Sequence, residues 1–322
     1  MDSNNLNKYK GSFKNYTELR AQENISKNIG LTNGDVTSNS KIIKGGVSAR
    51  VFQDGKWGFS SSPEINDDSI NNVIKASNEN AQFMSNKDNS RCGFFLPETQ
   101  SNYHMDLKTK KNYQSQKYWL EFVKEIDGYI DRKYPELLSR NVFLTELDME
   151  KSLVTSDGSE SYSMTPRSIL YLLLSIEKDG KPVNLYQIWG GLGQLEDKFI
   201  EPDDIHEDIN DLVKKLKDKS NGIHANAGLK NVILDSNLAG ILAHEAIGHT
   251  TEADLVMSGS VAGEYLGREV ASPIVNLIDY ANTCNGSTCP VPIYVDDEGT
   301  QSKDVVIIEN GILKNFMHNK DS

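Results

Sequence analysis

Residues 46–59 read Gly-Val-Ser-Ala-Arg-Val-Phe-Gln-Asp-Gly-Lys-Trp-Gly-Phe, and this stretch decides the predicted fold of the first part of the chain. Two short alternating runs flank Asp54-Gly55, a pair typical of the tight turn between antiparallel strands. Upstream, Tyr16–Glu23 alternates apolar and polar residues, and Asn33-Gly34 supplies another turn signal. The first sixty residues are therefore predicted to form β-hairpins.

Helical and strand patterns continue the chain to about residue 222. Apolar residues recur at helical spacing in Asp67–Met84, with Asp67 or Asp68 as the expected N-cap, and in Tyr118–Leu138. A third helix is expected over Pro202–Lys219, because acidic residues near its start and lysines toward its end complement the helix dipole. Strands are expected at 141–148, 151–156 and 167–178, with a hairpin turn at Asp179-Gly180. The glycine-rich stretch 189–194 lacks the Gly-Lys-Ser/Thr of a phosphate loop and is interpreted as a strand end or a close-approach segment.

The small-residue connector 222–228 is the expected domain boundary. After it we expect a short buried strand at Asn231–Asp235 and a helix capped by Asn237, then short strands at 291–295, 305–308 and 312–316. The predicted fold class is α+β. An N-terminal α/β domain (1–222), with antiparallel hairpins and flanking helices, precedes the beginning of a largely β C-terminal domain (223–322).

Composition and charge exclude several classes of function. The chain has 322 residues and a net charge of −12, which argues against nucleic-acid binding because phosphate contacts need basic surface. It contains no run of about 18 apolar residues and no apolar signal segment at its start, so neither a membrane span nor secretion is expected. An odd number of cysteines (Cys92, Cys284, Cys289) fits ordinary thiols in a reducing cytoplasm better than a Cys284–Cys289 disulfide.

The chemical motif is Ala243-His244-Glu245-Ala246-Ile247-Gly248-His249. Neutral imidazoles are good zinc ligands, and a glutamate beside one of them can act as general base on zinc-bound water. The familiar zincin spacing places its histidines four residues apart, whereas these are five apart, or roughly 140° around a regular helix. The motif therefore predicts a helix widened by a π-type turn at 246–248, with Gly248 easing the distortion. The alternative is two ordinary histidines and a solvated glutamate.

A catalytic zinc site normally has three protein ligands and water. Glu252 is a possible ligand, a carboxylate that orients a histidine, or a solvated residue; the second is expected. The candidates for a third ligand within the chain share no distinguishing spacing: Glu252, Asp254, Cys284, Cys289, His224 and His318.

The sequence resembles the TldD/PmbA family of peptidases, in its TldD-like branch. The resemblance spans the chain from about Tyr16 and rests on three blocks: Gly45–Phe59, Ala239–Asp254 with its H-E-x-x-x-H motif and acidic pair, and Tyr294–Thr300 followed by Ile307–Lys314. The family implies an N-terminal α/β domain and a largely β, metal-binding C-terminal peptidase domain. By that resemblance His244 and His249 bind zinc and Glu245 is the general base.

The resemblance also implies a substrate and partners. Active members are cytoplasmic zinc peptidases that hydrolyse unfolded or leader peptides, as homodimers or TldD–TldE heterodimers. Family members continue beyond the equivalent of Ser322 and take their third ligand from a cysteine near their C-terminus, so a C-terminally truncated chain with an incomplete zinc site is expected. The alternative function is an inactive subunit that serves in dimerisation or peptide binding.

Overall fold

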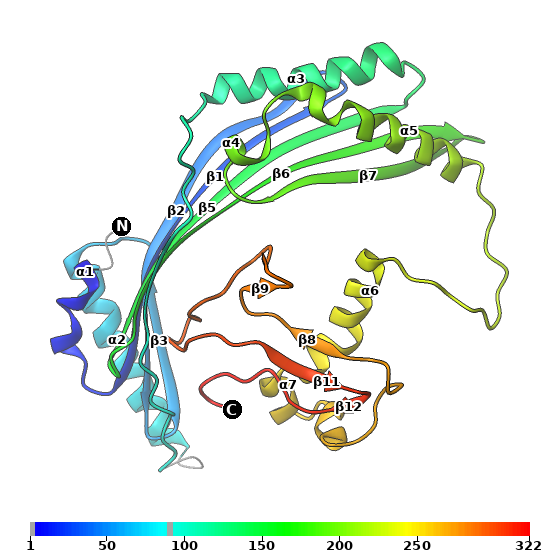
Figure 1. Cartoon of the computed structure of the whole chain (residues 1–322). Helices are drawn as coiled ribbons and strands as arrows, with labels where there is room; N and C mark the ends of the chain where they lie inside the picture. Colours follow the sequence, from blue (N-terminus) through cyan, green and yellow to red (C-terminus); the bar gives the residue numbers. More distant parts are fainter. Residues whose placement is uncertain (1–3, 89–92) are drawn as a thin grey trace.

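The computed structural model describes residues 4–88 and 93–322, and Cys92 lies outside them. A long seven-stranded sheet dominates the first two thirds of the chain, in the order β3-β2-β1-β5-β6-β4, with β7 also paired to β6 (Figure 1). All pairings are antiparallel except β4 with β6. Its strands are β1 (Tyr16–Thr32), β2 (Asp35–Gln53), β3 (Lys56–Ser62), β4 (Asn102–Asp106), β5 (Ser139–Thr155), β6 (Glu160–Lys178) and β7 (Lys181–Leu192).

The expected hairpin turns are present. Asn33, Asp54 and Asp179 each adopt positive φ and are each followed by a glycine that does the same, as a tight turn between antiparallel strands requires. Segments 141–148 and 151–156, predicted as two strands, are one continuous strand, β5. Residues 189–194 are a strand end and a close approach, as expected: a Cβ at Gly190 would lie 2.0 Å from the Ser168 carbonyl oxygen.

Two apolar cores on the same face of the sheet hold its helices. At one end α3 (Gln116–Lys133) and α5 (His206–Ser220) pack against the sheet, and at the other α1 (Asn4–Asn7) and α2 (Asp67–Lys87) do so. Strand β1 contributes odd-numbered residues to both cores: Ile29 and Leu31 pack in the core under α3 and α5, and Leu19 and Ala21 pack in the core under α1 and α2. These residues lie on one face of the sheet, because alternate residues of a strand share a face. The opposite face of the sheet is left free for the rest of the chain.

Helix boundaries differ from the sequence predictions in detail. Asn66, rather than Asp67 or Asp68, caps α2 by accepting a hydrogen bond from the Ser69 amide. Helix α3 ends at Lys133 rather than continuing to Leu138. The segment predicted as one helix from Pro202 is a 3-10 turn, η2 (Pro202–Ile205), followed by α5. Two further short elements are η1 (Lys10–Ser12) and α4 (Leu195–Lys198).

The C-terminal part packs around a small core of its own on the free side of the sheet (Figure 1). It contains helical and turn segments α6 (Ser236–Ala243), η3 (His244–Gly248), η4 (His249–Thr251), α7 (Ala253–Met257) and η5 (Val261–Tyr265). Its strands are β8 (Leu277–Asp279), β9 (Thr283–Cys284), β10 (Ser287–Thr288), β11 (Val305–Glu309) and β12 (Ile312–Leu313), with the expected turn at Asn310-Gly311. Among residues 4–88 and 93–322, no helix combines the length and apolarity needed to span a membrane.

Two strand predictions for this part of the chain are wrong. Asn231–Asp235 is neither a strand nor buried: Ile233 is 99% exposed, and the segment pairs with no strand among residues 4–88 and 93–322. Residues 291–295 form no strand either; Val295 makes only an isolated bridge to Gln301. The predicted strand 312–316 is limited to β12, whose partner β11 is short. Asp235 rather than Asn237 caps α6, by accepting from the Leu238 amide.

Candidate metal centre

The predicted widening of the helix is confirmed. Helix α6 runs directly into η3, a single π-helical turn over His244–Gly248, in which the His249 amide donates to the His244 carbonyl oxygen five residues back. A π turn takes up one more residue than an α turn. It therefore brings residues five apart, rather than four apart, onto one side of the helix.

The two imidazoles of the motif lie together as a result. The ring centroids of His244 and His249 are 4.4 Å apart, with the ring planes inclined by 64°. Both histidines are exposed, as is Glu245, which is part of the same π turn. This arrangement brings two imidazoles together at one accessible spot, with a glutamate next to the first of them in sequence, and imidazoles are good zinc ligands.

Glu252 contacts the ring of His249, as expected of a carboxylate that orients a histidine. Its Oε1 lies 2.8 Å from His249 Nδ1 and accepts the hydrogen of that nitrogen, which leaves the lone pair of the other ring nitrogen, Nε2, available to a metal ion. A carboxylate on the far nitrogen of a metal-binding histidine fixes the ring and raises its basicity. Residue 252 is itself held by the backbone on both sides, because Met317 donates to the Thr251 carbonyl and accepts from the Ala253 amide.

Thr250 and Thr251 have a role that the sequence did not indicate. Their hydroxyls donate to main-chain carbonyls at the end of the π turn: both reach Ile247, at 2.9 and 2.8 Å, and Thr251 also reaches Gly248 at 3.1 Å. A helix end leaves carbonyl groups without partners. The threonines supply these partners, so they stabilise the distorted turn; their signal is a pair of hydroxyl residues directly after the second histidine.

The π turn does not require the backbone freedom of glycine at Gly248, contrary to the sequence prediction. Its φ of −49° and ψ of −64° are right-handed helical, which any residue adopts. An added Cβ would make only ordinary contacts, 3.6 Å from the Ala243 carbonyl oxygen and 3.8 Å from His244 Nδ1. The distortion at 244–248 therefore does not depend on glycine's backbone freedom.

The other candidate ligands are not brought to the two histidines. Within residues 4–88 and 93–322, no three histidine, cysteine, aspartate or glutamate side chains form a group suited to a metal ion. Cys284 and Cys289, expected as ordinary thiols, are unpaired. Burial and the neighbouring Cys284 raise the pKa of the Cys289 thiol, the opposite of what a thiolate ligand needs. His318 instead lies 3.2 Å from the Ser322 hydroxyl.

Comparisons with known proteins match both parts of the chain. Residues 227–322 match the model of the PmbA/TldA metallopeptidase C-terminal domain, and residues 17–81 match that of PmbA/TldA metallopeptidase domain 1. A metalloprotease of Methanocaldococcus jannaschii is 30% identical over 315 residues, covering 95% of this chain and 66% of that protein.

The chain belongs to the TldD/PmbA family. It is also 28% identical to a zinc metalloprotease TldD homolog of Saccharolobus solfataricus, over 94% of this chain and 64% of that one. The chain thus spans about two thirds of the length of these curated relatives. Relatives named as metalloproteases place it in a protease family.

Solved structures share its fold. A Bacteroides thetaiotaomicron protein described as a modulator of DNA gyrase superposes with a TM-score of 0.73 at 16% identity, covering 98% of this chain and 70% of that one. TldE from Thermococcus kodakarensis gives a TM-score of 0.66 at 16% identity, over 97% and 69%. At such identities the likeness concerns the α+β fold alone.

Proposed function

We propose that this chain carries the histidine–glutamate part of the active site of a TldD-like zinc peptidase. His244 and His249 would bind zinc, and Glu245 would act as general base. The observation that carries the proposal is the π turn, which brings the two imidazoles within 4.4 Å of each other although five residues separate them. A helix has no structural need for that turn, and π turns concentrate at functional sites.

The chemistry follows from the residues. Bound zinc acts as a Lewis acid and makes water a better nucleophile at neutral pH. In this proposal Glu245, the residue after a proposed ligand, would take the proton from the attacking water as that water adds to the peptide carbonyl carbon. The same carboxyl group then gives the proton to the leaving amine nitrogen. Glu252 holds His249 in place throughout.

The remaining expectations join this proposal. We propose unfolded or leader peptides as substrates, a homodimer or a TldD–TldE-type heterodimer as the assembly, and the cytoplasm as the location. A relative named as a zinc metalloprotease and a structural neighbour named TldE support the metal and the pairing. A domain boundary at 222/223 fits the stretch 222–235, which links α5 to α6 without helix or strand.

The test is Glu245→Gln in the protein at its natural length. The variant should keep its zinc, because the carboxylate is not a ligand, and should lose about 10²–10⁴-fold in peptide hydrolysis. Zinc is measured by atomic emission and hydrolysis by mass spectrometry of an unstructured peptide. Wild-type turnover in the variant would contradict the assigned role.

The alternative is a subunit that binds peptides or a partner without turnover. It is favoured by the lack of a third ligand among the described residues. Under this alternative the wild-type protein binds peptide but neither it nor Glu245→Gln hydrolyses it, and zinc stays well below one per chain.

A further inference from the structure

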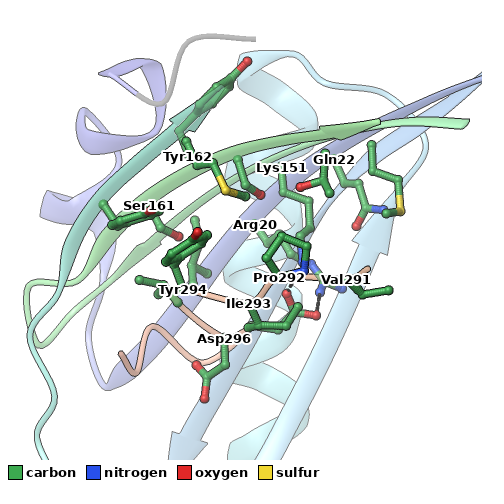
Figure 2. A pocket seen from close by; sticks show the side chains of 18 of the residues that line it. Arg20, Gln22, Lys151, Ser161, Tyr162, Val291, Pro292, Ile293, Tyr294 and Asp296 are labelled. Carbon is green, nitrogen blue, oxygen red and sulfur yellow. Dashed lines mark hydrogen bonds and ion pairs between the residues drawn. The ribbon is translucent and has the colours of Figure 1, made fainter. Parts of the chain in front are cut away.

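A cavity lies between the free face of the sheet and a C-terminal segment, separate from the histidine motif. Its volume is about 270 Å³, and strands β1, β5 and β6 line it on one side and residues 291–297 on the other. Figure 2 shows Val291, Pro292 and Ile293 crossing in front of Arg20 and Lys151. Tyr294 stacks on Tyr103 of β4, with ring centroids 4.8 Å apart, and so anchors the segment against the sheet.

Two of the three cationic side chains in the lining are already paired. Asp297 accepts from Arg20 Nη1 at 2.8 Å and from Lys151 Nζ at 2.6 Å. The other carboxylate of the lining, Asp296, accepts from the backbone amides of Glu298 and Thr300 within its own turn. Both carboxylates therefore have partners that do not include the third cation.

That third cation is Arg167 of β6. Its Nε atom is buried without a hydrogen-bond partner, and no ion pair or hydrogen bond links its guanidinium to any residue in 4–88 or 93–322. An unpaired, partly buried charge is unfavourable. This chain has 46 acidic residues against 34 basic ones, so an arginine without any carboxylate partner is unexpected here.

Arg167 continues a row of polar side chains along β6. Ser161, Ser163, Thr165 and Arg167 are alternate residues, so they share the face that lines the cavity. The structure shows no hydrogen bond from these three hydroxyls to another described residue. The row offers one guanidinium and three hydroxyl groups to one small space.

We propose that this cavity binds a single carboxylate of a peptide, held by the Arg167 guanidinium with the β6 hydroxyls beside it. The lining carries three cations and two carboxylates, so one negative charge balances it. A guanidinium matches a carboxylate with two parallel hydrogen bonds. The volume suits one or two residues, since pockets for larger ligands exceed about 300 Å³.

The choice of a peptide rests on the proposed peptidase function, whereas the cavity and its unpaired arginine do not. Binding is therefore measured apart from cleavage, in the Glu245→Gln background and by isothermal titration calorimetry. Three probes are compared: acetyl-Gly-Ser-Gly-Phe-Gly-Ser with a free carboxylate, the same peptide as its C-terminal amide, and that amide with glutamate as its last residue. The intactness of each probe is checked by mass spectrometry.

The free acid should bind about tenfold or more tightly than the amide, as expected for hydrogen bonds to a charged group. Arg167→Gln should remove this difference. The matched control is Arg132→Gln on the exposed surface of α3, which should keep it. Arg167→Gln is expected to fold normally because no described partner loses a contact, and circular dichroism melting verifies this. Arg167→Lys, which keeps the charge but not the paired geometry, should retain part of the preference.

Each outcome decides the proposal. If the glutamate-bearing amide binds like the free acid, the cavity accepts any peptide carboxylate; if it binds like the plain amide, only the terminal carboxylate is accepted. Equal binding of acid and amide, no binding at all, or an unchanged preference in Arg167→Gln would overturn the proposal. If the wild-type protein prefers the carboxylate but hydrolyses no peptide, the carboxylate site stands and the proposed peptidase function is wrong. If it hydrolyses peptides without preferring the carboxylate, the peptidase function stands and the carboxylate site is wrong.

Discussion

The imidazole rings of His244 and His249 lie beside each other, 4.4 Å apart between centroids, because the backbone between them forms a π turn. On a regular α-helix the same two residues would point roughly 140° apart. The threonine hydroxyls at 250 and 251 compensate carbonyl groups at the end of this turn. The distortion is thus built into the protein's own hydrogen bonds, and the fold itself brings the two imidazoles together.

Glu252→Gln tests whether the carboxylate on His249 supports metal binding. The amide can still accept a hydrogen bond from Nδ1, but without the charge that raises the basicity of the ring. We expect the zinc dissociation constant to rise about 10–100-fold, measured by competition with a chromophoric chelator in the protein at its natural length. Glu264→Gln, an exposed residue of η5, is the control. Equal zinc affinities of both variants would mean that Glu252 is only a solvated neighbour.

Local signals allowed the hairpins and the π turn to be predicted from sequence. Each Asn-Gly or Asp-Gly pair fixes its own turn through positive φ, and the five-residue spacing of His244 and His249 allows a shared site only on a widened helix. Burial is not local. Val-Ile-Leu at 232–234 has the composition of a buried strand, yet Val232 and Ile233 are exposed, because no strand in the described part of the chain pairs with this segment.

Capping and tertiary contacts limited the remaining predictions. Asn66 and Asp235 are each followed by acidic or polar residues whose side chains are equally good N-caps by residue type. Only the backbone geometry decides which residue of each group caps the helix. The pairing of Glu252 with His249 was among the sequence alternatives. The unpaired state of Arg167 was not accessible, since it depends on where residues 291–297 cross the sheet.

Gly248→Ala tests the finding that the π turn does not require glycine. The residue is right-handed helical and has room for a Cβ, so alanine should leave the free energy of unfolding unchanged or raise it by about 0.5–1 kcal/mol. Zinc affinity should be unchanged. Gly248→Leu is the contrasting variant, because a large side chain there would press on the His244 ring. A clear loss of zinc binding in the alanine variant, by chelator competition, would show that backbone freedom is needed after all.

Asp148→Asn should stabilise the fold at neutral pH. Burial, and then the neighbouring Glu146, raise the pKa of Asp148 to about 6, against the opposing hydrogen bond from Gln194. Since the folded-state pKa lies above the ordinary value near 4, the charged carboxylate costs stability above pH 6, and this cost disappears as the pH falls through 6 towards 4. The asparagine variant avoids that cost and still accepts from Gln194.

Urea unfolding at two pH values checks this. At pH 8 Asp148→Asn should exceed the wild type by about 1–3 kcal/mol in unfolding free energy, and at pH 4.5 the gap should shrink to about a third of that. Asp211→Asn, on the exposed side of α5, should show no such pH-dependent gain. A gap of equal size at both pH values would assign the effect to packing instead of ionisation.

Lys320→Met should weaken the attachment of the C-terminal part to the sheet. The Lys320 ammonium is almost fully buried and donates to Asp157 Oδ2 at 2.7 Å and to the Tyr16 hydroxyl at 2.6 Å. Burial favours the neutral form of Asp157, but the ammonium and the Thr155 hydroxyl outweigh it and hold the pKa of Asp157 below its usual value. Methionine leaves that carboxylate without its cation, which costs about 3–5 kcal/mol in unfolding free energy.

The consequence should reach the histidine motif through the backbone. Three residues before Lys320, Met317 pairs with Thr251 and Ala253 on either side of Glu252. Loosening the anchor should therefore speed hydrogen exchange at the Ala253 and Met317 amides in Lys320→Met. Lys314→Met, which removes only the exposed ion pair with Glu309, should change neither exchange nor stability by more than about 1 kcal/mol. Adding Asp157→Asn to Lys320→Met should recover part of the lost stability, since the unpaired charge is then gone. Unchanged exchange at Ala253 in a destabilised Lys320→Met would mean that the anchor and the motif are held independently.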